Sequence, residues 1–339
     1  MAIPYRTKRL LGRLGILLLS IAIALAVVAG CYLLLANKHI TYDRYAGAIY
    51  DPHHSTEGLQ WEQVQETEPA ETVTIYYNEG ENQLNVSTDL TQMVGYYVTA
   101  QELQTNIGAV KTQLQQLEKG TAVMFDVKSI KGNFFYSSNV ATYRNPDIDI
   151  AAMDELLEYL KLSDLYAVAR LPAFRDFNYG LNHVPDGLPA PGGYLWMDDD
   201  RCYWLNPTSQ GTINYLVNII NELKKLGFDE VVFYDFCFPE TDGIVFKQDK
   251  TQALTDTAQL LVDTCATETF AVSFVGKTDF PLPDGRSRLY MEGVEAAQAA
   301  ALAAQTGMED PSVYLVFLTD LHDTRFDAYS VLRPLSAAH

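Results

Sequence analysis

Apolar residues first form one unbroken run near the start of the chain. Residues 14–36 contain no charged side chain, and a helix of about 20 apolar residues spans the roughly 30 Å hydrocarbon core of a bilayer. Four basic residues precede the run, and no acidic residue occurs before Asp43. Because basic flanks stay in the cytoplasm, the pattern predicts a cytoplasmic tail over 1–13, a transmembrane helix over 14–36 and an extracytoplasmic remainder.

A lipid anchor is the alternative to this helix. Val28-Ala29-Gly30-Cys31 resembles a bacterial lipobox, in which the cysteine is lipidated after cleavage. Cleaved signal peptides have shorter apolar cores, and the apolar residues 32–35 continue past Cys31, which favours an intact helix. Either outcome tethers the rest of the chain to a membrane.

The next residues form no long apolar pattern. Residues 37–71 are polar and acidic, which is typical of a stalk or flexible linker. Within 72–89, β-forming residues flank the turn-rich segment 78–82, and this pattern predicts a β-hairpin that precedes the main domain.

From residue 90 onward, short apolar segments alternate with longer amphipathic ones, which is typical of repeated βα units and a parallel sheet. The eight predicted strands are Met93–Thr99, Thr121–Lys128, Tyr166–Phe174, Glu230–Phe238, Phe270–Gly276, Arg288–Gly293, Ser312–Thr319 and Ala328–Arg333. The predicted helices are Gln101–Glu118, Asp149–Leu160, Ser209–Leu226, Lys250–Thr264 and Gly293–Thr306.

This count of elements over residues 90–339 predicts an α/β fold, a (β/α)₈ TIM barrel. Gly227 follows a strongly periodic helix and is expected to cap it. A doubly wound open sheet is the alternative, and a long insertion over 175–206 is compatible with both.

Charge and motifs exclude several function classes. The residues after the predicted membrane helix hold all 43 acidic residues but only 20 of the 24 basic ones, so nucleic acid is not expected as a partner. The phosphate loop, the dinucleotide turn and the serine nucleophile elbow are absent from the sequence. No nucleotide, cofactor or metal is therefore expected. Three cysteines, Cys202, Cys237 and Cys265, have no disulfide or zinc spacing and are interpreted as buried small apolar residues.

Four segments resemble a bacterial family of glycoside-hydrolase-like barrel domains. They are Phe125-Asp126-Val127-Lys128 with Gly132 and Tyr136, the stretch from Ala169 to Asp176, Trp204-Leu205-Asn206-Pro207, and Gly227-Phe228-Asp229-Glu230 with Phe238-Pro239. The resemblance covers residues 91–238 and implies the barrel fold and carbohydrate chemistry.

The chain departs from that family at two strands. Where the fourth family strand has an aspartate and an arginine, this chain has Tyr234 and Cys237, and its acid is displaced by one residue to Asp235. In a strand, one residue changes the face, so Asp235 either points away from the barrel mouth or reaches it only through a local bulge. The fifth strand, over 271–276, lacks the acid that many family members have.

Glycoside hydrolysis needs two carboxyl groups on either side of the scissile bond, about 5 to 9.5 Å apart. Asp126 and Asp235 are the candidate catalytic pair, because both follow predicted parallel strands. Three neighbouring phenylalanines are expected to raise the pKa of Asp235, and Lys128 is expected to keep Asp126 ionised. Structural roles, such as an Asp126–Lys128 ion pair, are the alternative. Glu240 and Glu292 are weaker candidate acids, and Asp320, His322 and Asp323 form only a weak candidate metal set.

Sugars present apolar C–H faces, so their sites combine aromatic rings with a few polar groups. The candidate substrate-binding residues are Lys128, Arg170, Tyr97, Trp196 and Trp204. Packing within the barrel is the alternative role for each aromatic residue.

The sequence therefore predicts a membrane-anchored, extracytoplasmic glycoside hydrolase of the bacterial cell envelope that acts on a cell-surface or extracellular polysaccharide. Its expected partner is a carbohydrate polymer or cell-wall glycan. The alternative is a catalytically degenerate barrel that binds glycan or an envelope protein as a scaffold. The two hypotheses differ in whether the carboxyl groups of Asp126 and Asp235 meet in one open pocket.

Overall fold

The computed structural model describes residues 40–43, 47–50 and 89–337. The chain divides into two compact units, Met1–Asn82 and Gln83–His339. In the first unit, β1 (Ile40–Asp43) pairs antiparallel with β2 (Gly47–Tyr50). These strands fall within the predicted stalk over 37–71, for which the sequence pattern indicated no strands.

Two predictions concern residues outside the described part. The membrane helix over 14–36 and the hairpin strands over 72–77 and 83–87 lie there. Of the helices that the structure describes, none is both long enough and apolar enough to cross a membrane.

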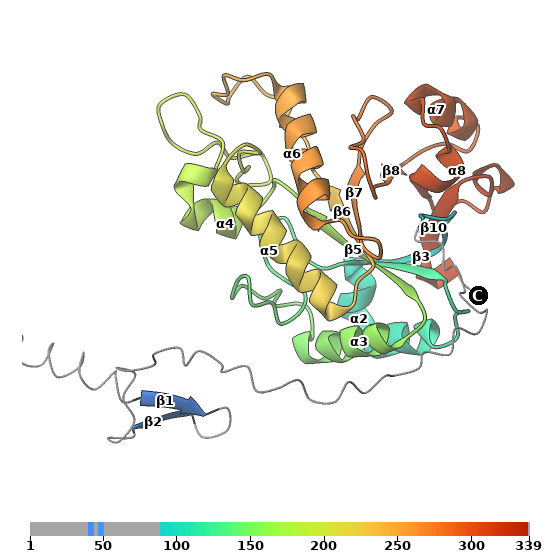
Figure 1. The fold of residues 1–339 in the computed structure, drawn as a ribbon, viewed down its shortest axis with the longest axis horizontal. Helices are drawn as coiled ribbons and strands as arrows, with labels where there is room; N and C mark the ends of the chain where they lie inside the picture. The colour runs from blue at the N-terminus through green and yellow to red at the C-terminus, as the bar shows by residue number, and fades with distance from the viewer. Residues whose placement is uncertain (1–39, 44–46, 51–88, 338–339) are drawn as a thin grey trace, which may run out of the picture. The chain divides into compact units, whose positions relative to one another are not determined.

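Eight parallel strands close into a barrel in the second unit (Figure 1). Their order is β10-β3-β4-β5-β6-β7-β8-β9, and β9 pairs with β10 to complete the circle. The strands are β3 (Val94–Val98), β4 (Ala122–Asp126), β5 (Tyr166–Pro172), β6 (Glu230–Tyr234), β7 (Ala271–Val275), β8 (Leu289–Glu292), β9 (Leu315–Leu318) and β10 (Ser330–Pro334). The predicted (β/α)₈ barrel and its eight strands are confirmed, and the open sheet is excluded.

Helices surround the strands, and α5 and α6 lie side by side on one flank (Figure 1). The helices are α2 (Ala100–Leu114), α3 (Ile150–Leu162), α4 (Phe177–Asn182), α5 (Gln210–Leu226), α6 (Lys250–Cys265), α7 (Ala299–Thr306) and α8 (Pro311–Tyr314), with short 3₁₀ segments at Val184–Asp186, Thr324–Phe326 and Leu335–Ala337. The sequence pattern missed α4 and α8. Between β7 and β8 the described chain forms an irregular loop without a helix.

Local sequence signals fix where several helices begin and end. Thr99 and Glu102 form a capping box at the start of α2, because each side chain accepts a hydrogen bond from the other residue's backbone N–H. At the other end of a βα unit, Gly227 adopts a φ of 92° after α5, which confirms the predicted cap. The left-handed conformation costs glycine little because it has no Cβ.

The inner faces of the strands form three layers. Side chains alternate between the two faces of a strand, so residues two apart on one strand point the same way into the barrel. The middle layer is apolar and includes Met124, Val168, Val232, Tyr290 and Val316. A polar layer at the strand starts lies below it, and another polar layer at the strand ends lies above it. The upper layer forms the barrel mouth.

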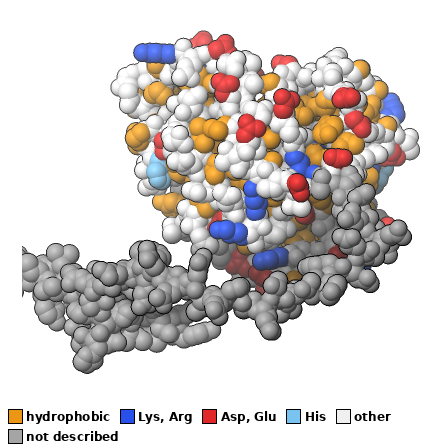
Figure 2. Space-filling model, viewed as in Figure 1, with side chains coloured by type: hydrophobic (Ala, Val, Ile, Leu, Met, Phe, Trp, Pro, Cys, Tyr) orange, Lys and Arg blue, Asp and Glu red, His pale blue; other side chains and the backbone are white. Residues whose placement is uncertain are grey.

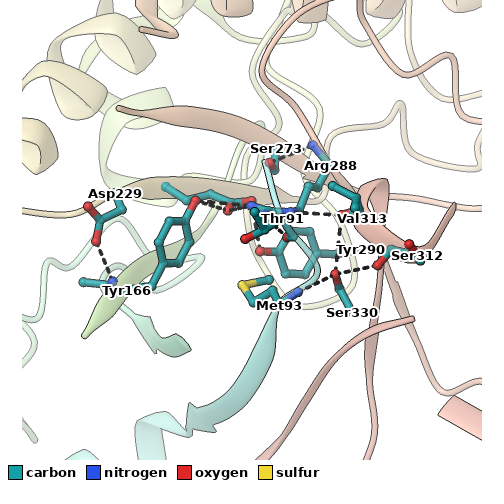
Figure 3. A network of polar contacts seen from close by, with 12 residues as sticks. Thr91, Met93, Tyr166, Asp229, Ser273, Arg288, Tyr290, Ser312, Val313 and Ser330 are labelled. Atoms are coloured by element: carbon teal, nitrogen blue, oxygen red, sulfur yellow. Dashed lines mark hydrogen bonds and ion pairs between the residues drawn. The ribbon is translucent and has the colours of Figure 1, made fainter. Parts of the chain in front are cut away.

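The lower layer contains a buried ion pair between Arg288 and Glu230. Figure 3 labels Arg288 together with Tyr166 and Tyr290 of the same network. Arg288 Nη1 donates to Glu230 Oε2 at 2.5 Å, and their side chains are 3% and 0% exposed. The hydroxyls of Tyr166 and Tyr290 also donate to Glu230. Arg288 additionally donates to the carbonyls of Thr91 and Val313. These bonds connect β5, β6 and β8 with the segments that lead into β3 and β9.

Replacing Arg288 should test how strongly this network holds the barrel. Arg288→Met leaves Glu230 buried without its positive partner, and removing one member of a buried pair costs about 3–5 kcal/mol. We expect the free energy of unfolding, measured by urea denaturation, to fall by about this amount. Arg325→Met is the control, since the Arg325–Asp323 pair is largely exposed and should contribute little. Equal effects of the two substitutions would contradict this view.

Candidate active site

The upper layer brings four polar side chains together at the mouth. Asp126, Tyr234 and Glu292 are the last residues of β4, β6 and β8, and Arg170 lies near the end of β5. Asp126 pairs in register with Arg170 on the neighbouring strand. Three of the four, Asp126, Arg170 and Glu292, line a cavity of about 490 Å³ together with Tyr97, Thr99 and Asp320.

Arg170 connects two carboxyl groups across this cavity. Its Nη1 donates to Asp126 Oδ1 at 2.8 Å, and its Nη2 donates to Glu292 Oε1 at 2.7 Å. The guanidinium carbon lies 4.4 Å from the centre of the Tyr234 ring, a cation–π contact that holds the fork in place. The two carboxyl groups are therefore separated by the width of one guanidinium and two hydrogen bonds, a span comparable with that of glycosidase carboxyl pairs.

The two acids differ in their surroundings. Burial raises the pKa of Asp126 above its usual value, and the charge and hydrogen bond of Arg170 offset this only in part. The side chain of Glu292 is 41% exposed, compared with 22% for Asp126. Burial therefore pushes Asp126 toward the protonated form.

The predicted role of Lys128 is corrected by the structure. Its side chain is fully buried and donates to Asp176 Oδ2 at 2.7 Å, and Tyr215 donates to the same oxygen at 2.9 Å. Lys128 lies beyond the end of β4, so it has left the alternation that places Asp126 in the mouth. Through Asp176 it supports the loop before α4. It lines neither the cavity at Asp126 nor the cavity at Asp235, and it does not form the expected ion pair with Asp126. Lys128 is therefore not placed to bind substrate.

Asp235 reaches the mouth through an irregular backbone, as the shifted motif requires. Strand β6 ends at Tyr234, whose ring occupies the inward position, and Asp235 follows with a φ of 51°. Non-glycine residues rarely adopt this left-handed conformation. Burial raises the pKa of Asp235, and the nearby Arg175 partly offsets this effect.

Asp235 lines a second, larger cavity of about 1050 Å³. Trp196 and Trp204 also line it, with ring centres 6.3 Å apart and planes at 62°. Trp204 is only 7% exposed and donates from Nε1 to Asp198 at 2.9 Å, whereas Trp196 is half-buried and presents more surface. Figure 2 shows acidic side chains on both sides of a dip in the upper edge of the barrel unit.

The structure thus separates the expected pair, because Asp126 lines the first cavity and Asp235 the second. Glu292 lines both cavities and is the acid that shares a guanidinium with Asp126. From the sequence, Glu292 was predicted only as a weaker candidate acid, since no motif surrounds it. Its signal is positional: it is the last residue of a strand, two residues after the inward-facing Tyr290.

The other predicted binding residues have mixed positions. Tyr97 and Arg170 line the first cavity, and Trp196 and Trp204 line the second. Asp320 of the weak metal set lines the first cavity, while His322 and Asp323 line a separate depression with Glu295. Within the described residues, no three His, Cys, Asp or Glu side chains are arranged to hold a metal ion.

A family model described as "Putative glycosyl hydrolase domain" matches residues 95–272, just over half of the chain. The chain belongs to this glycosyl hydrolase family. The match begins in β3 and ends in β7, so it includes Asp126, Arg170 and Asp235 but not Glu292. A comparison with curated proteins finds no match.

Several solved structures are similar to this member of the family at low identity. A hypothetical protein from Ruminiclostridium thermocellum ATCC 27405 is 19% identical, with 52% of this chain and 96% of that chain covered and a TM-score of 0.45. Aspergillus fumigatus Ega3, solved in complex with galactosamine, is 9% identical over 73% and 93% of the two chains, with a TM-score of 0.45.

A GH20 exo-β-N-acetylglucosaminidase from Vibrio harveyi is 9% identical, with 67% of this chain covered and a TM-score of 0.45. This chain spans only 41% of the length of that enzyme. These values are too low to transfer an activity, so the fold rests on the strand pairing of the barrel itself.

Removing the charge of Arg170 should raise the pKa of Asp126 further. Arg170→Gln takes away the positive charge that favours the ionised carboxylate, so the carboxyl-carbon NMR titration of Asp126 should move to higher pH. Arg325→Gln is the matched control. It should leave Asp126 unchanged and raise the pKa of Asp323, which Arg325 holds at about 2. An unchanged or lower Asp126 pKa in Arg170→Gln would refute the electrostatic role of Arg170.

Proposed function

We propose that the barrel is a glycoside hydrolase that cleaves a polysaccharide at its mouth with two carboxyl groups, Asp126 and Glu292. The observation that carries this proposal is that one guanidinium, Arg170, binds both groups in an open cavity at the strand ends. Active sites of (β/α)₈ enzymes lie at this end of the barrel. Membership of the glycosyl hydrolase family supports the same chemistry.

The two acids suit different steps. Asp126, with its raised pKa, would donate a proton to the glycosidic oxygen as the bond to the anomeric carbon breaks. Glu292 is more exposed and would act as the second carboxyl group, either attacking the anomeric carbon or activating a water. Arg170 would position both groups, and substrate entry would compete with one of its hydrogen bonds. Tyr97 at the cavity wall offers a ring for the apolar face of a sugar.

Removal of either acid tests this mechanism. We expect Asp126→Asn and Glu292→Gln each to reduce the release of reducing ends from the cleaved polysaccharide by roughly 10²–10⁴-fold, the usual contribution of a catalytic acid or base. The panel should contain neutral, N-acetylated, deacetylated and uronic acid polymers. Glu118→Gln is the control, because Glu118 is exposed beside the start of β4, at the opposite end of the barrel. Wild-type activity in Glu292→Gln would refute the assignment.

A barrel that binds glycan or an envelope protein without cleaving is the second candidate function. Two observations favour this scaffold role. The ion pairs of Arg170 with Asp126 and Glu292 neutralise both acids. In addition, Tyr234 stands at the position where the family that the sequence resembles has an acid. Binding of a polymer by the wild-type chain without release of any reducing end would support this scaffold role over catalysis.

We further propose that residues 14–36 anchor the barrel to the cell membrane and leave it outside the cytoplasm, where wall and surface glycans are within reach. The uncharged run and its basic flank support this location.

The anchor can be tested by fractionation of cells that express the chain. We expect the full chain in the membrane fraction and sensitive to protease added to cells with an opened wall. Deletion of residues 14–36 should keep it inside the cytoplasm and protected. Cys31→Ser distinguishes the two anchors, since it leaves a helix-anchored chain unchanged but prevents lipidation at Cys31. Full-length protein that is soluble in the cytoplasm would contradict the proposal.

A further inference from the structure

One hollow beside the mouth is apolar, unlike the two cavities at the mouth itself. It encloses about 790 Å³ and is lined by ten residues, none of which is charged. Ten large apolar side chains are exposed in the described part of the chain, and four of them line this hollow. They are Leu181, Val184, Tyr194 and Met197. Single exposed apolar residues are normal, but a cluster of them marks a surface that binds something. We call this surface the aromatic depression.

The exposed ring of Tyr194 is held by a tight turn. The backbone N–H of Ala190 donates to the carbonyl of Tyr194 at 2.8 Å, and Gly192 and Gly193 between them have φ values of 105° and 86°. A Cβ at Gly192 would lie 3.0 Å from the Tyr194 ring, so the ring rests against this glycine. Tyr194 is nevertheless 66% exposed. It therefore presents a fixed apolar face to the solvent.

The ring of Trp196 is also held in place. The backbone N–H of Trp196 donates to the carbonyl of Leu188 at 2.9 Å. Its ring edge lies against Gly243, where a Cβ would be 2.8 Å from Nε1, and the Trp204 ring lies 6.3 Å away between ring centres. Rings that are already fixed lose little conformational entropy when a ligand stacks on them. The aromatic depression is therefore preorganised for a ligand with flat apolar faces.

Four concave surfaces share lining residues in series, and the aromatic depression is the last of them. The depression that Glu295 lines, just before α7, shares Glu295 and Leu321 with the first cavity. The first and second cavities share Glu292, and the second cavity shares Trp196 and Met197 with the aromatic depression. Helices α7 and α4, at the two ends of this series, lie on opposite sides of the barrel (Figure 1). The series therefore runs across the mouth, with the proposed cleavage site between its ends.

We propose that the aromatic depression is a distal subsite that binds an uncharged stretch of the polysaccharide, and that the barrel cleaves its substrate within the chain. This inference rests on the proposed function, because it places the polymer that Asp126 and Glu292 would cleave. Sugars stack their apolar C–H faces on aromatic rings, and a lining without charge fits a neutral sugar unit. Cavities that continue past the cleavage site on both sides accept the interior of a chain, whereas a closed pocket accepts only its end.

Other occupants fit this surface less well. A stable protein interface uses about 20–30 residues on each partner, and only ten line the aromatic depression. An anionic membrane surface would be repelled by Asp198, Asp199 and Asp200, which directly follow Met197. The residues shared with the second cavity connect the depression to the proposed cleavage site. The polymer bound at that site is therefore the occupant that this arrangement favours.

The lengths of the products test cleavage within the chain. The full-length chain is incubated with the neutral and N-acetylated polymers of the panel, and the products are separated by size at early times. Internal cleavage should yield fragments of many lengths and lower the viscosity of the polymer solution before many reducing ends are released. Release of one short product from the earliest times would show cleavage from a chain end and overturn the inference.

Tyr194→Ala tests the distal subsite. The ring is exposed, so its loss should leave the barrel folded. Loss of one aromatic contact corresponds to about a three- to tenfold loss of affinity. We expect kcat/KM for the long polymer to fall to this extent, mainly through a higher KM, while the shortest oligomer that the wild type cleaves is cleaved at an unchanged rate. Tyr194→Phe keeps the ring and should behave as the wild type.

Tyr143→Ala is the matched control. Tyr143 is the other exposed tyrosine among the described residues, at 41%, and it lines none of the four concave surfaces. Its removal should leave the cleavage of every chain length unchanged. Equal losses in Tyr143→Ala and Tyr194→Ala would contradict a specific subsite.

The outcomes separate this inference from the function on which it rests. Cleavage only from chain ends, or cleavage of charged polymers alone, would overturn the inference and leave the hydrolase proposal standing. Binding of an uncharged polymer that depends on Tyr194, without any cleavage, would support the subsite and refute the hydrolase. A wild-type dimer that Tyr194→Ala converts to monomers, measured by analytical ultracentrifugation, would show that the depression joins two copies and overturn the subsite. If no carbohydrate polymer is bound or cleaved, both proposals fail together.

Discussion

The barrel depends on one ion pair buried where its strands begin. Glu230 and Arg288 have almost no contact with solvent, and every hydrogen bond that they form within the network reaches a different strand or connecting segment. Two charges in an apolar interior are stable only when they are paired and hydrogen-bonded. The pair therefore connects β6 to the start of β8 at the base of the barrel, and its hydrogen bonds extend this connection to β5 and to the segments before β3 and β9.

Two of these strands, β5 and β6, contribute inward-facing side chains both to the base and to the mouth. On β6, Glu230, Val232 and Tyr234 occupy the lower, middle and upper layers in steps of two residues. On β5, Tyr166, Val168 and Arg170 repeat the pattern. A slip of one residue would turn Glu230 of β6, or Arg170 of β5, outward into the helix layer. The register that buries Glu230 is thus also the register that aims Arg170 at Asp126 and Glu292.

The sequence was sufficient for the fold because the relevant signals are local. Each strand appears as a short apolar segment, and Gly227 marks a helix end by itself. The site was harder, since its decisive contacts join residues far apart in the chain: Arg170 with Glu292, and Lys128 with Asp176. The shifted acid in the fourth strand motif did indicate that Asp235 needs an irregular backbone. Sequence could not show that Asp126 and Asp235 line different cavities, because that depends on how the strand ends and insertions pack.

The apolar middle layer has an evolutionary consequence. Met124, Val168, Val232 and their neighbours insulate the ion pair at the base from the charged groups at the mouth. Because distant sites that share no partners contribute additively to stability, residues at the mouth can change without weakening the base. Substitutions of the acids at the mouth, such as Asp126 and Glu292, should therefore leave the ion pair at the base intact. A barrel with this architecture can accept changes in the groups that would contact a ligand without losing its fold.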